Sequence, residues 1–137
     1  MPKSRKAEGQ PFIIINLNRQ EYLDPLHWGH GATLNEIANA RHGVMRALAY
    51  LTAVGGHLGA GGIPTNCPWF GAWAFNTVAL VGPLFDLGGG YIPYANAKEA
   101  YRDVSHQVMS AINDAIIRPT LTADAAAVVL GVHNIRR

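Results

Sequence analysis

The sequence predicts an α+β fold in which a small sheet is packed by helices. Two apolar segments have the composition of buried strands, residues 12–17 and residues 72–82. Three other segments repeat apolar residues at spacings of three and four, as amphipathic helices do: 34–54, 106–117 and 123–130. The chain has 137 residues, 49% of them hydrophobic, which is enough for one domain with its own core. We assign residues 11–132 to that domain.

The two predicted strands carry different apolar patterns. Phe12 leads a run of three isoleucines, which is typical of a strand covered on both faces. In residues 72–82, alternation places Trp73 and Phe75 on the same face. Gly82-Pro83 ends this segment, and we expect residues 91–97 to be irregular.

The first predicted helix has the clearest boundaries. Thr33 and Glu36 fit a capping box, and Gly55-Gly56 ends the periodic segment. A glycine-rich loop then extends to Pro68. Ser105 is expected to cap the helix at 106–117, and Thr122 the helix at 123–130.

The basic residues gather at the two ends of the chain. The net charge is +2, while residues 1–10 and 133–137 each carry a net +2. The body between these tails therefore holds six basic against eight acidic residues. Because phosphate-tracking surfaces need clustered Lys and Arg, nucleic-acid binding is an alternative only through the tails.

The middle of the chain is uncharged, with no Asp, Glu, Lys or Arg between Arg46 and Asp86. Glycines and prolines interrupt it, so we expect no membrane span. It holds four large aromatic residues within seven positions: Trp69, Phe70, Trp73 and Phe75. One strand cannot bury all four on one face, and Trp and Phe are frequent interface anchors. These residues predict an interaction surface.

A polar cluster before the first helix suggests a different class of function. Asp24, His27 and His30 could bind a metal, because histidines three apart can reach one ion. The segment formed by Gly29, His30, Gly31 and Thr33 could bind an anion at the helix start. The structural alternative is that His27 and Trp28 pack beneath the helix entry. The sequence contains no G-x-S-x-G motif, and no cofactor is predicted.

Short motifs resemble a family of small prokaryotic proteins with no known activity. The opening matches in Asn16-Leu17, in Glu21-Tyr22-Leu23-Asp24-Pro25, in Gly29 and in Leu34-x-Glu36. Later matches are Gly71-x-Trp73-Ala74, Val81-Gly82 and Tyr101-Arg102-Asp103-Val104-Ser105. The family pattern has Gly-Asp-Arg where this chain has Phe75-Asn76-Thr77, and Gly-Asp where it has Gly82-Pro83. The resemblance implies that this chain has exchanged acidic groups for apolar surface.

The leading hypothesis is a non-enzymatic interaction or assembly subunit. It would act through the aromatic surface as a homo-oligomer or within a larger protein assembly. The rival is a small metal- or anion-dependent enzyme or ligand-binding protein centred on Asp24, His27 and His30. A single cysteine, Cys67, cannot form an internal disulfide, and no secretory signal is evident, so we expect a cytoplasmic protein.

Overall fold

The computed structural model describes residues 9–40, 43–54 and 67–117, and it confirms the α+β class. The strands are β1 (Ile13–Asn16), β2 (Glu21–Leu23), β3 (Val78–Val81) and β4 (Arg102–Asp103). The α-helices are α2 (Leu34–Asn39), α3 (Val44–Thr52), α4 (Pro93–Ala100) and α5 (Ser105–Ile112). A 3₁₀ helix, η1 (Pro25–Trp28), follows β2, and a π-helix, η2 (Asn113–Ile117), continues α5.

The sheet has the strand order β3-β1-β2-β4, so β3 and β4 are its two edges. β1 is antiparallel to both neighbours, with Ile14 opposite Leu23 on one side and Leu80 on the other. β4 runs parallel to β2. All four residues of β1 are buried, which confirms the two-sided burial predicted from the isoleucine run.

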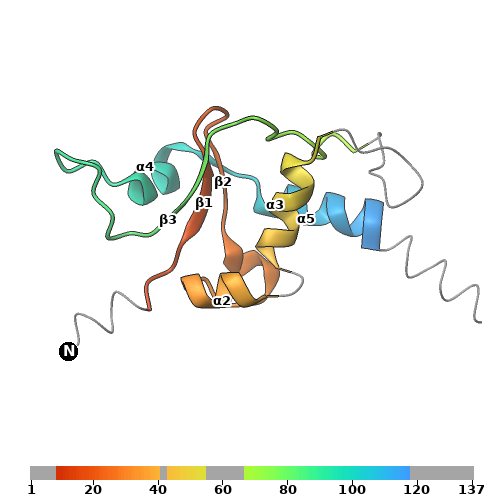
Figure 1. Ribbon diagram of the computed structural model, residues 1–137, viewed down its shortest axis with the longest axis horizontal. Helices are drawn as coiled ribbons and strands as arrows, with labels where there is room; N and C mark the ends of the chain where they lie inside the picture. Colours follow the sequence, from red (N-terminus) through yellow and green to blue (C-terminus); the bar gives the residue numbers. More distant parts are fainter. Residues whose placement is uncertain (1–8, 41–42, 55–66, 118–137) are drawn as a thin grey trace, which may run out of the picture.

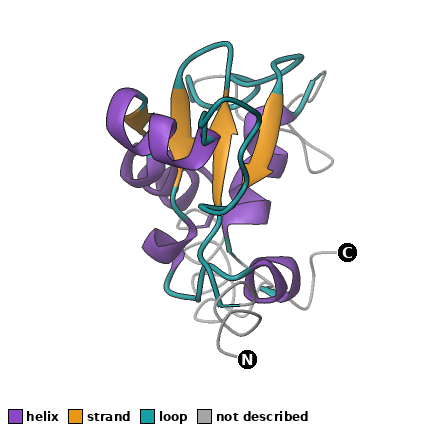
Figure 2. Ribbon diagram, turned by 90° about the vertical axis from the view of Figure 1, so that its left-hand side faces the viewer, coloured by secondary structure: helices purple, strands orange, loops and turns teal. Residues whose placement is uncertain are grey.

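Helices cover both faces of the sheet, and Figure 1 shows α4 on one side with α2, α3 and α5 on the other. Because strand side chains alternate, Ile14 and Leu23 join the core under α2, α3 and α5. Ile13, Ile15 and Tyr22 pack instead in a smaller cluster that includes Ala97 of α4. Figure 2 views the strands side by side from the α4 side.

The single helix predicted over residues 34–54 is two helices. α2 ends at Asn39, Ala40 is extended, and α3 starts after an extended Gly43. Ile37 and Val44 nevertheless enter the same core. Their spacing of seven fits one helix or two, and for this reason apolar periodicity alone could not locate the break. The capping box of Thr33 and Glu36 is confirmed.

The strand predicted over residues 72–82 is limited to Val78–Val81. The residues before it form successive turns, in which four amides donate to the carbonyl three residues back, those of Phe70, Ala72, Ala74 and Asn76. Gly71 and Phe75 have φ angles of 74° and 65°, and this left-handed backbone cannot belong to a strand.

Several other expectations need correction. The segment predicted to be irregular contains α4, which begins with Pro93 at a position that favours proline. The cap of α5 is Val104 rather than Ser105, although the helical span at 105–117 agrees with prediction. The predicted helix at 123–130, residues 1–8 and 133–137 of the tails, and most of the glycine-rich loop lie outside the described residues. Within the described segments, no helix has the length and hydropathy needed to cross a membrane.

Candidate functional site

The four aromatic residues of the predicted surface have different environments. The side chain of Trp73 has no exposed area, and Trp69 and Phe70 pack against the same core while half-buried. Phe75 is 92% exposed. In the single chain Trp73 is therefore not accessible to a partner, and Phe75 is the member of the predicted surface that faces solvent most fully.

The turn that carries these aromatics closes the end of α3. The amides of Gly71 and Trp73 donate to the carbonyls of Tyr50 and Leu51, at 3.0 and 2.9 Å. The last carbonyls of a helix lack partners within the helix, so these bonds fix the turn on α3. The rings of Tyr50 and Phe70 also lie 5.2 Å apart, centre to centre. Trp69, Phe70 and Trp73 thus have a structural role.

Trp73 reaches across the core to a buried carboxylate. Its indole N–H donates to Glu21 Oε1 at 2.8 Å, and Arg19 Nε donates to the same oxygen at 2.9 Å. Arg102 donates to the second oxygen, Oε2. Burial on its own raises the pKa of Glu21, but hydrogen bonds from Arg19, Trp73 and Arg102 outweigh it and hold that pKa below its ordinary value. This closed network joins β2 to β4 and to the aromatic turn.

The segment between Trp73 and β3 is fixed by two asparagines of the β1–β2 hairpin. Asn16, buried on β1, donates to the side chain of Asn76 at 2.9 Å. Asn18 accepts from the amide of Thr77 at 2.5 Å. Phe75 lies between Trp73 and Asn76, and its backbone is left-handed, a conformation that costs a residue with a side chain about 1–2 kcal/mol. These anchors hold an aromatic ring out in solvent on a strained backbone.

β3 follows directly and forms an outer edge of the sheet. Among the described residues, its strand partner is β1 alone. The four residues Val78–Val81 carry no charge and no proline, and Leu80 is 36% exposed. Edge strands in stable monomers are commonly protected by charged side chains, proline or very short length. β3 lacks the first two devices, and within residues 9–40, 43–54 and 67–117 no strand pairs with its outer side.

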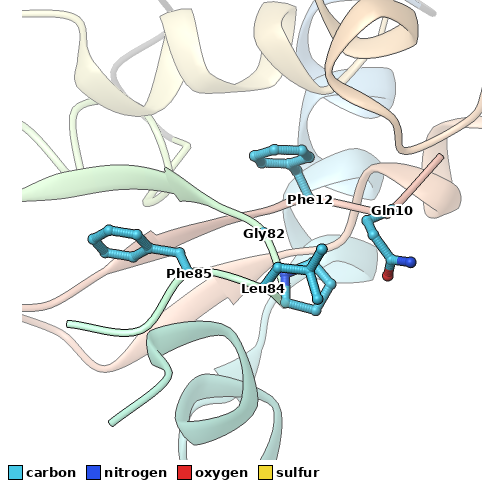
Figure 3. A pocket seen from close by; sticks show the side chains of 6 residues that line it. Gln10, Phe12, Gly82, Leu84 and Phe85 are labelled. Carbon is cyan, nitrogen blue, oxygen red and sulfur yellow. The ribbon is translucent and has the colours of Figure 1, made fainter. Parts of the chain in front are cut away.

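The chain after β3, residues 82–91, adds further exposed apolar side chains. Leu84 and Phe85 are 65% and 52% exposed, and Leu87 is exposed as well. Leu84, Phe85, Gly82 and Pro83 line an almost wholly apolar pocket of about 230 Å³, with Phe12 and Gln10 on its far side (Figure 3). Gly82 packs closely on the Phe12 ring, since a Cβ at this position would lie 3.1 Å from it and the ring would have to shift. A pocket of this size can accept one large apolar side chain.

The three residues of the predicted metal site are separately engaged. Asp24 Oδ1 accepts from the amide of Leu26 at 3.1 Å, and its Oδ2 lies 3.3 Å from Lys98 Nζ. His27 Nε2 lies 3.5 Å from Asp103 Oδ2. Within residues 9–40, 43–54 and 67–117, no three His, Cys, Asp or Glu side chains converge as metal ligands. The geometry does not favour the predicted metal site.

His30 has a structural role at the start of α3. Its Nδ1 lies 2.7 Å from the carbonyl of Gly31, and its Nε2 accepts from the amide of Val44 at 3.4 Å. A Cβ at Gly43 would meet the imidazole at 2.0 Å, so a glycine is needed there. His27, which was predicted to pack beneath the helix entry, lies exposed beside Asp103.

The predicted anion site is occupied by a carboxylate. Thr33 donates its amide and its hydroxyl to Glu36 Oε1, at 3.1 and 2.7 Å. The same carboxylate lies where a Cβ on Gly31 would be, 1.9 Å from the ideal position. Bonds from Thr33 lower the pKa of Glu36 below its ordinary value, which favours its charged form. Because a negative charge repels an anion, this geometry does not favour anion binding.

Comparison of the chain with protein-family models, curated proteins and solved structures gave no match. The residues themselves therefore carry the functional argument. Sequence reasoning found the uncharged segment and Phe75, but it missed the open edge of β3 and the pocket beside Leu84 and Phe85. The sequence signal for both features is the apolar run Val78–Val81 followed by Gly82-Pro83-Leu84-Phe85. Finding them required this run to be interpreted as an edge strand and not as a buried strand.

Proposed function

We propose that the protein is a non-enzymatic assembly subunit that pairs with a second copy of itself through the outer edge of β3. The observation that carries the proposal is the combination of this uncharged edge with Phe75, which is exposed on a strained backbone beside it. Strained and exposed apolar groups persist where the surroundings enforce them, and they concentrate at functional sites.

Charge favours a second copy as the occupant. In a two-fold symmetric interface each patch faces an identical patch, so a charged patch would meet its own charge. The segment from Ala47 to Phe85 contains no charged residue, and its exposed part can meet itself without repulsion. Pairing of two β3 edges would also join the two sheets into one continuous sheet, with main-chain hydrogen bonds supplying part of the affinity.

Apolar burial supplies the rest of the affinity. Four large apolar side chains lie on β3 or within four residues of it and are exposed in the single chain: Phe75, Leu80, Leu84 and Phe85. Burial of one large apolar side chain contributes about 1.5–3 kcal/mol before the costs of association. Several such side chains on each copy are sufficient for a dimer at micromolar concentration.

The test is the mass of the full-length protein in solution. Size-exclusion chromatography with light scattering at tens of micromolar should give about twice the 14.7 kDa of one chain. Leu80→Lys places a charge on the edge and should reduce the mass to that of one chain, since charged side chains block edge pairing. Leu26→Lys is the matched control, because Leu26 is exposed on η1 and away from β3; it should remain a dimer.

Two results would contradict the proposal. One is a wild-type mass of a single chain across this concentration range. The other is a Leu80→Lys variant that keeps the wild-type mass while its circular dichroism spectrum shows it to be folded. A monomer that takes up an apolar dye in the pocket would assign the site to a small ligand instead.

A further inference from the structure

We infer that the two β3 strands pair antiparallel with Leu80 opposite the partner's Leu80, and that Phe75 then lies at the partner's apolar pocket. This inference rests on the proposed function and specifies its register. Its evidence is the direction of the backbone groups of β3, the symmetry of a pair of identical strands, and the position of the pocket.

The hydrogen bonds to β1 show which peptide groups of β3 remain free. The amide of Leu17 donates to the carbonyl of Thr77 at 3.0 Å, and Ala79 and Val81 lie opposite Ile15 and Ile13. In an antiparallel ladder, residues that exchange bonds with one neighbour alternate with residues that face away. The backbone N–H and C=O groups of Thr77, Ala79 and Val81 therefore point toward β1. The N–H and C=O groups of Val78 and Leu80 face outward. We extend this alternation to Gly82, whose carbonyl also accepts from the amide of Phe85 at 3.4 Å and has a second lone pair for a partner.

Symmetry restricts how two such edges can meet. Antiparallel neighbours related by a two-fold axis must have that axis perpendicular to the sheet, because opposite side chains point to the same face. One residue of β3 then lies opposite itself, and near the centre of the strand this residue is Ala79 or Leu80. A register with two different central residues opposite each other would put their side chains on opposite faces.

The two allowed registers differ in the number of hydrogen bonds. With Leu80 central, the two Leu80 residues exchange bonds, and each Val78 pairs with the partner's Gly82. With Ala79 central, the outward residues make only the two pairs between Val78 and the partner's Leu80. The Leu80 register thus uses one more bonded pair. Pro83 does not interrupt it, since position 83 faces the β1 side and its missing N–H is not needed.

The Leu80 register also matches the apolar groups that flank the strand. Phe75 lies five residues before Leu80, and Phe85 lies five residues after it. Because the two strands run antiparallel, the end of β3 that carries Phe75 lies beside the end of the partner's β3 where Phe85 and Leu84 line the pocket. The pocket volume of about 230 Å³ suits one aromatic ring. This placement removes from water the ring that is 92% exposed in the single chain.

Disulfide trapping tests the register in the full-length protein. With Cys67→Ser as background, Leu80→Cys should cross-link readily under mild oxidation, since directly opposite side chains meet the distance for a disulfide. Ala79→Cys should form at least about tenfold less cross-linked dimer, because in this register it faces the partner's Val81 and its own counterpart lies on the diagonal, about 7–8 Å away. The Cys67→Ser variant alone should keep the wild-type mass and form no cross-link.

The outcomes separate this inference from the proposed function. Stronger cross-linking of Ala79→Cys than of Leu80→Cys would overturn the register and leave the dimer in place. A wild-type dimer by light scattering in which neither cysteine cross-links would also overturn the register alone. A wild-type monomer would overturn the proposed function and this inference together.

Discussion

The two edges of the sheet are built from opposite kinds of residues. The β4 edge is two residues long, and its Arg102 binds the buried Glu21 while its Asp103 holds the Ser105 hydroxyl at 2.5 Å. The β3 edge is four residues long, uncharged, and flanked by exposed Phe75 and Leu84. Short length and charge protect an edge from pairing. Among the described residues, charged side chains protect the β4 edge and not the β3 edge, and the proposed pairing therefore uses β3.

The largest difference in stability is expected between substitutions of two aromatic residues: Trp73, which binds Glu21 in the core, and Phe75, which flanks the β3 edge. Trp73→Ala removes a fully buried ring and its bond to Glu21, and it should reduce the free energy of unfolding by about 3–5 kcal/mol. Phe75→Ala should change it by no more than about 0.5 kcal/mol, while weakening the dimer. Urea unfolding measures the first effect and light scattering the second. Equal losses of stability in the two variants would contradict the division into a core aromatic and a surface aromatic.

The stability that Glu21 contributes by binding Arg102 of the β4 edge should be lost in acid. Since the folded-state pKa of Glu21 lies below its ordinary value, its stabilisation is present above the unfolded pKa and is lost as the pH falls through the folded one. The free energy of unfolding should therefore decline below about pH 4.3, the ordinary value for a glutamate. Urea unfolding at a series of pH values measures this decline.

Glu21→Gln isolates the contribution of that carboxylate. It should reduce stability by about 2 kcal/mol at pH 7, because it removes the charge from three hydrogen bonds. It should also flatten the decline in acid. A variant with the full wild-type decline would assign the acid sensitivity to other groups.

The strain at Phe75 can be measured directly. Phe75→Gly places glycine on a backbone with φ near 65°, where relief of strain outweighs the extra flexibility of the unfolded chain; the variant should be more stable by up to about 1 kcal/mol. Ala74→Gly, the neighbouring control, should lose about 0.5–1 kcal/mol. Thermal unfolding of both variants gives the comparison. Destabilisation by Phe75→Gly would show that the ring contributes to the fold of the single chain.

The smallest expected effect is that of salt on association. Charges separated from the interface by more than a Debye length are screened already, and the β3 edge has none of its own. The dissociation constant of the dimer should therefore change less than about twofold between 0.05 and 0.5 M NaCl. Analytical ultracentrifugation at both concentrations provides the measurement. A strong dependence on salt would locate the interface on a charged surface.

Local sequence signals predicted the parts of the fold that depend on local chemistry. The isoleucine run of β1 and the pair Thr33 and Glu36 behaved as expected, because two-sided burial and helix capping each depend on a few neighbouring residues. The break before Gly43 could not be predicted, since it depends on contact with the distant His30. The same holds for β4, which forms only when Arg102 meets Gln20 and Glu21 across the chain.

The candidate site was predicted only in part. The uncharged segment and its aromatics were visible in the sequence, but alternation in a strand placed Trp73 and Phe75 on one face. The turn at Phe75 instead leaves Trp73 buried and Phe75 exposed. The geometry of this turn depends on the asparagines of the β1–β2 hairpin. The pocket needs the distant Phe12.

Amide hydrogen exchange within β3 tests the central claim most directly. The amides of Ala79 and Val81 face β1 and should exchange slowly at every protein concentration. The amide of Leu80 faces outward, so it should exchange rapidly in dilute protein and slow by at least about tenfold once the dimer forms, because exchange then requires the pair to open. Rapid exchange of Leu80 at all concentrations, with Ala79 protected throughout, would contradict pairing through this edge.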